Sequence, residues 1–157
     1  MLGPDYLEQY MKSRGISGEI IRLSPSAAKT SASAAESVGC EISQIAKSIV
    51  LKGEERYYVV VLSGDKRIDL KKASATLRDT LRLAKPEEIL EQTGYPVGGV
   101  PPFGHANSLK ILVDKSLLRF EEVYSSGGSD NTLLKIKVKE LIKATGTGYG
   151  GVVDFST

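Results

Sequence analysis

The segment with the least ordinary composition is residues 94–105, GYPVGGVPPFGH, which contains four glycines and three prolines and is called the glycine–proline loop below. Prolines fix φ and remove backbone donors, whereas glycines reach positive φ and let a ligand approach the main chain. Such a loop can hold the N–H groups of Gly98 and Gly99 ready for a carbonyl oxygen that gains negative charge. The alternative is a structural crossover loop without a ligand, although loops of this length inside compact domains are often functional.

Two titratable side chains are candidates for chemistry near this loop. His105, the only histidine, ends the loop. It could act as a general base, but a supporting contact is the commoner role. Lys47 precedes Ser48 and the apolar residues 49–51, and if it faces inward its burial demands an anionic partner or a lowered pKa. From the residues alone, a solvated lysine at a strand end is the favoured alternative.

Two further segments are polar enough to meet a ligand. Residues 125–130, SSGGSD, lie between two predicted strands, either as a hairpin turn or as a second polar rim of a site. A basic cluster forms either a solvated helix face or a contact for RNA phosphates; its members are Lys66, Arg67, Lys71, Lys72 and Arg78. Residues 146–151 match G-x-G-x-x-G but join no strand to a helix, so we do not expect a dinucleotide site there.

The composition narrows the class of protein. A chain of 157 residues fits one domain, and we treat residues 1–157 as such. One cysteine and one histidine cannot make a disulfide or a Cys/His zinc site, and no tight carboxylate cluster is visible, so we expect no metal and no cofactor. The N-terminus does not resemble a signal peptide, and no apolar run is long enough for a membrane span. We therefore expect a cytoplasmic protein, whose net charge of +2 permits a nucleic-acid partner without requiring one.

The elements that must position these residues are short helices and strands. Helical spacing, caps and Pro or Gly boundaries predict helices at 4–14, 30–38, 68–77, 86–93 and 139–144. Apolar or alternating runs predict strands at 18–23, 47–51, 57–62, 109–114, 121–125 and 132–138, with 152–155 as a possible edge strand. Because regular βαβ repetition is absent, we expect an α+β fold, a single domain with a mixed, mainly antiparallel sheet and flanking short helices.

Four segments occur in an order that is similar to one known family. They are residues 45–50 (IAKSIV), 63–72 (SGDKRIDLKK), 94–104 and 123–128 (VYSSGG). The chain thus resembles the YbaK/ProX family of aminoacyl-tRNA deacylases, which is related to the editing insertion of bacterial prolyl-tRNA synthetases. The resemblance covers about residues 16–145.

The resemblance implies hydrolysis of the ester between a wrong amino acid and tRNA, with aminoacyl-tRNA as partner and an aminoacyl-tRNA synthetase as an optional second one. By position, Lys47 resembles the family's essential lysine, and Gly98 and Gly99 resemble the glycines that bind the aminoacyl group. These three are the expected catalytic residues. The expected substrate-binding residues are Thr30 (a loose match), Pro102, Gly104, His105, Ser126 and Gly127.

One departure from the family leaves the specificity open. The synthetase insertion places a functional histidine near the late Ser-Gly segment, and residues 128–132 contain none. The edited amino acid therefore stays open among cysteine, alanine, serine and threonine, as does the oligomeric state. Two other functions also stay open: a tRNA or aminoacyl-ligand binding module without hydrolysis, and an interaction domain whose loop docks a synthetase.

Overall fold

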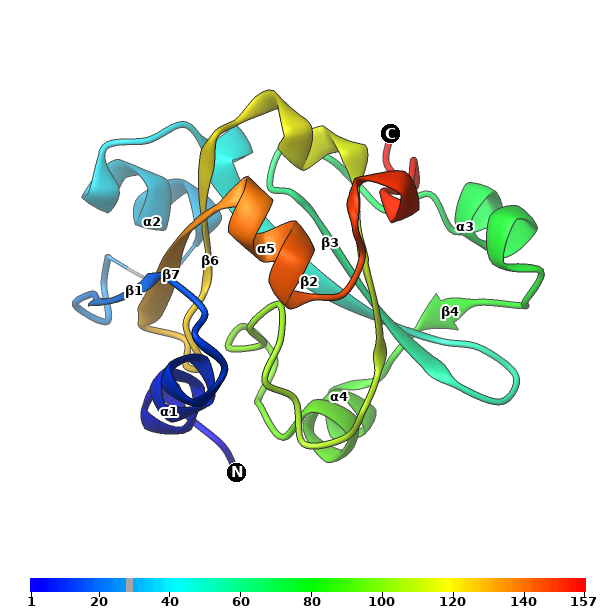
Figure 1. The fold of residues 1–157 in the computed structure, drawn as a ribbon, viewed down its shortest axis with the longest axis horizontal. Helices are drawn as coiled ribbons and strands as arrows, with labels where there is room; N and C mark the ends of the chain where they lie inside the picture. Colours follow the sequence, from blue (N-terminus) through cyan, green and yellow to red (C-terminus); the bar gives the residue numbers. More distant parts are fainter. Residues whose placement is uncertain (28–29) are drawn as a thin grey trace.

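The computed structural model describes residues 1–27 and 30–157, and a mixed β-sheet organises them (Figure 1). Within these residues the strand order is β1-β7-β6-β2-β3-β5, and β4 pairs with β2 beside this path. The β2–β6 and β3–β5 pairs are parallel and the others are antiparallel, which confirms the expected α+β class with a mainly antiparallel sheet. The strands are β1 (Glu19–Arg22), β2 (Ile45–Lys52), β3 (Tyr57–Ser63), β4 (Arg82–Leu83), β5 (Lys110–Val113), β6 (Glu122–Ser126) and β7 (Thr132–Lys137).

The helices begin and end at local sequence signals. They are α1 (Pro4–Arg14), α2 (Ser31–Val38), α3 (Leu70–Leu77), α4 (Pro86–Thr93) and α5 (Val138–Ala144), with short 3-10 turns at Ile42–Gln44, Lys115–Arg119 and Tyr149–Gly151. Thr30 caps α2 through a capping box with Ser33, and Gly39 ends it at φ 73°. The third helix starts at Leu70 rather than at 68, because the Asp69 carboxylate accepts from the first free amides and acts as N-cap.

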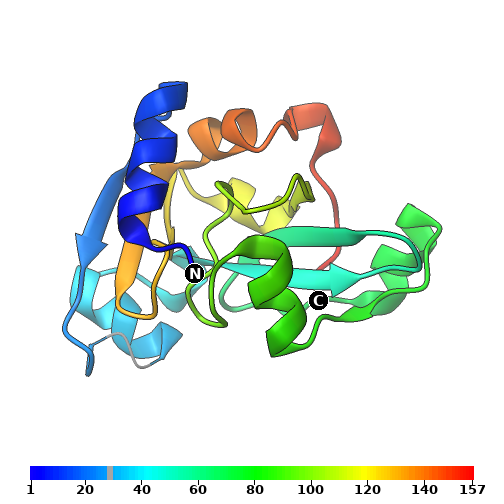
Figure 2. The same cartoon turned by 90° about the horizontal axis from the view of Figure 1, so that it is seen from below.

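Both faces of the central strands are covered, so β3 is buried except at its first residue, whereas residues 47–49 in the middle of β2 are only partly buried. One core joins Val59 and Val61 of β3 to α1 and α5, and the other joins Val60 and Leu62 to α3. Figure 2 shows α1 and α5 on one side of the sheet, and α3 packs against the side chains of the opposite core. Because neighbouring side chains of a strand point to opposite faces, one strand supplies both cores.

The C-terminal segment differs from the expected edge strand at 152–155. It forms only isolated bridges, Asp114 with Val153 and Ile68 with Ser156. The buried Asp114 carboxylate accepts from the Phe155 N–H (2.7 Å) and the Ser156 hydroxyl (2.8 Å). The Asp114 side chain thus fixes this segment together with scattered backbone hydrogen bonds, such as the one from the Val153 N–H to the Val113 carbonyl (3.0 Å), in place of a continuous strand ladder. In the described ranges, no helix is long and apolar enough to cross a membrane.

Candidate functional site

The site begins with an opening in the sheet beside β2. The pairing of β2 with β6 ends at Ala46, and its pairing with β4 begins at Leu51. The Val50 carbonyl accepts a hydrogen bond from the Ala84 N–H on this edge (2.9 Å). Because backbone groups two residues apart point to the same edge, the N–H and C=O of Ser48 also face the opening. The divergence of two neighbouring strands therefore exposes main-chain polar groups inside the fold.

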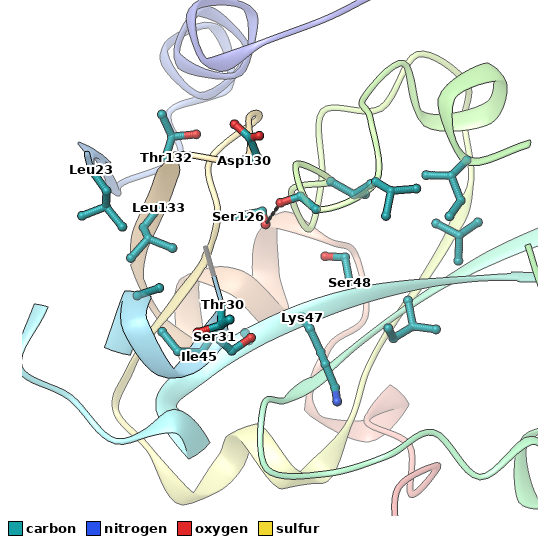
Figure 3. A pocket seen from close by; sticks show the side chains of 18 of the residues that line it. Leu23, Thr30, Ser31, Ile45, Lys47, Ser48, Ser126, Asp130, Thr132 and Leu133 are labelled. Atoms are coloured by element: carbon teal, nitrogen blue, oxygen red, sulfur yellow. Dashed lines mark hydrogen bonds between the residues drawn. The ribbon is translucent and has the colours of Figure 1, made fainter. Parts of the chain in front are cut away.

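A cavity of about 360 Å³ fills this opening (Figure 3). The walls come from β2, from α2 and its cap, from the β4–α4 connection, from the glycine–proline loop, and from the β6–β7 turn. Apolar side chains such as Val50 and Leu133 line much of it, and the polar groups come from separate elements. Ligand pockets have this character, with an apolar wall and a few convergent polar groups.

Four of the residues expected at the site line this cavity: Thr30, Lys47, Gly98 and Ser126. They come from four segments distant in sequence, so the fold brings them together. The other five, Gly99, Pro102, Gly104, His105 and Gly127, are not among the lining residues in the described part of the chain.

The two glycine amides of the loop differ. The Gly99 N–H donates to the Pro96 carbonyl (2.9 Å) and closes a turn in which Gly98 has φ 86°, as the third position of a type II turn requires. The expectation of two free amides is therefore corrected, because one of them closes the turn. The Gly98 N–H belongs to the central peptide of the turn, and in residues 1–27 and 30–157 it has no hydrogen-bond acceptor. It is the amide available to a ligand.

The β6–β7 turn holds the glycine–proline loop in place. The Ser126 hydroxyl donates to the Gly98 carbonyl (3.0 Å). A Cβ at Gly99 would lie 3.0 Å from the Ser129 Cα, so the two loops are in backbone contact there. Gly127 is buried and donates its N–H to the Thr132 carbonyl (3.0 Å), which places it within the turn and away from the cavity.

The second half of the glycine–proline loop packs on α1. Gly104 has φ 76°, and its position leaves room for Leu7 and Tyr10 of α1. His105 Nε2 lies 2.8 Å from the Pro101 carbonyl, and the ring meets Tyr95 edge-on. Burial lowers the pKa of His105, while the hydrogen bond to Pro101 opposes that shift. These contacts place His105 as a support of the loop.

Lys47 leaves β2 on the side opposite to Ser48 (Figure 3). Its side chain is half-buried and extends toward the turn that follows β3. Burial first, and then the positive charge of Arg67, lower the pKa of Lys47, whereas the Asp65 carboxylate raises it. In the described ranges no carboxylate forms a salt bridge with Lys47. Lys47 is therefore half-buried without an ion pair to any of the described residues, and its pKa is lowered, which was one of the two outcomes expected for an inward-facing lysine.

Two polar residues of the cavity were not expected as site residues, although Asp130 belongs to the segment 125–130 for which a polar rim was one of the two interpretations. Ser48 Oγ is buried, and within the described residues neither it nor Ser125 Oγ has a hydrogen-bond partner. Ser48 lines the cavity, and Ser125 does not. Asp130 supplies a carboxylate at the exposed part of the wall. A serine beside a lysine in an otherwise apolar strand was the available signal for Ser48, whereas nothing local separates Asp130 from an ordinary turn aspartate. Across residues 1–27 and 30–157, no three His, Cys, Asp or Glu side chains gather as a metal site.

Comparison with known proteins identifies the family of the chain and a solved structure with the same fold. The family model described as "Aminoacyl-tRNA editing domain" matches residues 25–144, so the chain belongs to the aminoacyl-tRNA editing domain family. A crystal structure described as that of a proposed trans-editing enzyme for prolyl tRNA synthetase superposes with a TM-score of 0.92 at 37% identity, covering 98% of this chain and 96% of that one.

Two curated proteins are similar to part of the chain. The uncharacterized protein YwhH of Bacillus subtilis is 42% identical over 109 residues, 69% of each chain. A proline–tRNA ligase of Thermosipho melanesiensis is 36% identical over 98 residues, which are 62% of this chain and 17% of the ligase. The chain thus matches a small part of a synthetase, in agreement with the expected relation to its editing insertion.

Proposed function

We propose that the chain hydrolyses the ester bond of mischarged aminoacyl-tRNA in trans and releases free amino acid and tRNA. The observation that carries the proposal is the cavity itself. In a fold of the editing family, it combines an available amide at Gly98 with a half-buried cation at Lys47 and a hydroxyl at Ser126. Charged tRNA presents a carbonyl ester, a ribose and phosphates, which match these groups in chemical character.

The reaction follows from what each group can bind. A water oxygen attacks the ester carbonyl carbon, the bond from this carbon to the ribose oxygen breaks, and the leaving ribose oxygen takes a proton from the attacking water to become a hydroxyl. The Gly98 N–H donates to the oxyanion that forms. The peptides before and after it are held by hydrogen bonds at the Pro96 and Gly98 carbonyls, so this donor needs no rearrangement. Holding the ester against this donor supplies most of the catalysis, and a substrate hydroxyl or thiol assists the attacking water.

Asp130 and the other residues expected at the site bind the aminoacyl group and the terminal adenosine, or shape the loops around them. The Asp130 carboxylate faces the cavity and suits the α-ammonium that every aminoacyl ester carries. Lys47 meets the phosphate or ribose of the terminal adenosine as a point charge. Gly99, Pro102, Gly104, His105 and Gly127 then act on the substrate through the shape of the two loops.

The test is release of free amino acid from a panel of tRNAs charged with cysteine, alanine, serine or threonine. Hydrolysis of at least one is expected without a synthetase present, and Lys47→Ala should abolish it while the melting temperature changes little. If every charged tRNA stays intact but tRNA binds, the chain is a binding module. If tRNA does not bind either, an interaction domain for a synthetase accounts better for the loop.

A further inference from the structure

The turn after β3 carries a second cation toward Lys47. Lys47 is in register with Leu62, directly before this turn. Gly64 donates its N–H to the Ile45 carbonyl (2.6 Å), and a Cβ on Gly64 would lie 2.5 Å from the Ile42 carbonyl oxygen. The turn is therefore folded tightly back on the start of β2, where Ile45 stands two residues before Lys47.

Arg67 is held at this position by its backbone. Its N–H donates to the Thr157 carbonyl (3.3 Å), and its carbonyl accepts from the Thr157 N–H (2.9 Å). The guanidinium is left to solvent, and in the part of the chain that the structure describes it joins no salt bridge. Its charge nevertheless reaches Lys47, whose pKa is lowered mainly by burial and then by Arg67.

The carboxylate of Asp65, which follows β3 in the same turn, is already paired with another cation. Asp65 accepts from both terminal nitrogens of Arg119 (2.8 and 3.2 Å) and from the Ser63 hydroxyl (2.8 Å). The hydrogen bond from Arg119 is the main cause that lowers the pKa of Asp65 to about 2, so the carboxylate is fully ionised and engaged. Lys47, which lines the cavity, and Arg67, which lies outside its lining, thus remain two cations that join no salt bridge in the described ranges.

We propose that Lys47 and Arg67 together form a binding site for a phosphodiester of the single-stranded 3′ end of the RNA. This inference rests on the proposed function, because it places the phosphate that enters with the ester. Two like charges held together on a firm backbone repel each other in the free protein, and a phosphate between them removes that repulsion. Arg67 matches a phosphate in geometry because its planar fork donates to two oxygens. It is a binding residue for the RNA and takes no part in the bond-breaking step.

The experiment compares two esters of the same amino acid: charged tRNA and the aminoacyl ester of adenosine, which has no phosphate. Arg67→Ala should lower kcat/KM on charged tRNA by about tenfold and change hydrolysis of the adenosine ester less than about twofold. Arg67→Lys should keep part of the activity on tRNA. Lys143→Ala, which removes an exposed cation from α5 on the other side of the sheet, is the matched charge control and should leave both substrates unaffected.

Binding gives a readout that is independent of hydrolysis. An RNA hairpin that carries no amino acid and has a single-stranded CCA end should bind Arg67→Ala more weakly than it binds the wild type. The slope of log affinity against log salt should also become shallower, by about 0.7 for each phosphate that the variant no longer neutralises. Unchanged affinity and salt slope would overturn the phosphate site even if the esters are cleaved. An equal decrease on both esters would also overturn it, since Arg67 would then act on the fold or the chemical step. If no ester is cleaved while the hairpin binds through Arg67, the proposed hydrolysis fails and the phosphate site stands.

Discussion

The Ser126 hydroxyl donates a hydrogen bond to the Gly98 carbonyl oxygen over 3.0 Å, and this contact ties the β6–β7 turn to the glycine–proline loop. The next amide, that of Gly99, is held by the Pro96 carbonyl. The peptide between Gly98 and Gly99 is thus fixed at its oxygen and at its nitrogen. The preceding peptide, which carries the Gly98 N–H, is oriented as a result.

If Ser126 sets this orientation, its removal should reduce catalysis more than stability. We expect Ser126→Ala to lower kcat by about three- to tenfold, the equivalent of one partly exposed hydrogen bond of about 0.5–1.5 kcal/mol, with KM little changed. Ser126→Thr, which keeps the hydroxyl, should retain most of the rate. Steady-state deacylation of a charged tRNA measures both constants, and a wild-type kcat in the alanine variant would show that the loop needs no such tie.

Substitutions of the two loop glycines should have different effects. A Cβ at Gly98 meets nothing within 4 Å, so Gly98→Ala adds only the strain of a positive φ, about 1–2 kcal/mol, and a methyl group at the cavity wall. A Cβ at Gly99 lies 3.0 Å from the Ser129 backbone and pushes the two loops apart. We expect both variants to lose deacylation, and Gly99→Ala to have the larger decrease in melting temperature. The reverse order in thermal melts would contradict this assignment of the two glycines.

A pH-dependent stability follows from the lowered pKa of His105. A base whose pKa is lower in the folded state binds fewer protons there than in the unfolded chain. Its contribution to stability is complete above the unfolded value of 6.5 and is lost as the pH falls from there through the folded pKa. His105→Gln keeps an N–H donor for the Pro101 carbonyl and does not titrate.

The free energy of unfolding of the wild type should therefore fall more steeply than that of His105→Gln between pH 7 and pH 5. Urea titrations at several pH values measure this difference. The glutamine variant should deacylate tRNA at pH 7.5 at close to the wild-type rate, because the ring supports the loop outside the cavity. A large decrease in rate with unchanged stability would instead make His105 a catalytic group.

Local signals in the sequence are sufficient for most elements of the fold. The first helix is predicted at residues 4–14 and occurs there, since Pro4 opens it and Gly15 ends it at φ 66°. The strand β4 escapes prediction because two residues, Arg82 and Leu83, make no pattern. The apolar residues of the segment 152–155 fit an edge strand, whereas the buried carboxylate of Asp114 and scattered backbone hydrogen bonds to separate segments hold it instead.

The site is less accessible to sequence reasoning than the fold. Its shape depends on where β2 leaves β6, and this divergence is a property of pairing between distant segments. For the same reason the sequence could not tell that the Gly99 amide closes a turn and that the Gly98 amide does not. Lys47 could be singled out by its position in an apolar strand, but the influence of the Arg67 charge on its pKa requires the fold.

The buried hydroxyls of Ser48 and Ser125 offer a test that separates structure from ligand binding. In the described ranges both lack a hydrogen-bond partner, and an unsatisfied buried hydroxyl costs about 1–3 kcal/mol. Replacement of either serine by alanine should therefore leave the melting temperature unchanged or raise it. Only Ser48 lines the cavity, so Ser48→Ala alone should lose activity, by about tenfold, if the hydroxyl waits for a polar group of the substrate.

Ser125→Ala is the matched control, because it removes the same group from the neighbouring strand outside the cavity wall. Thermal melts and deacylation rates of the two variants separate the effect on stability from the effect on activity. A Ser48→Ala variant that is more stable and slower would show that stability is given up at this position in favour of substrate binding. A variant that is more stable and equally fast would remove Ser48 from the site and leave Gly98 and Asp130 as the polar groups that contact the aminoacyl ester.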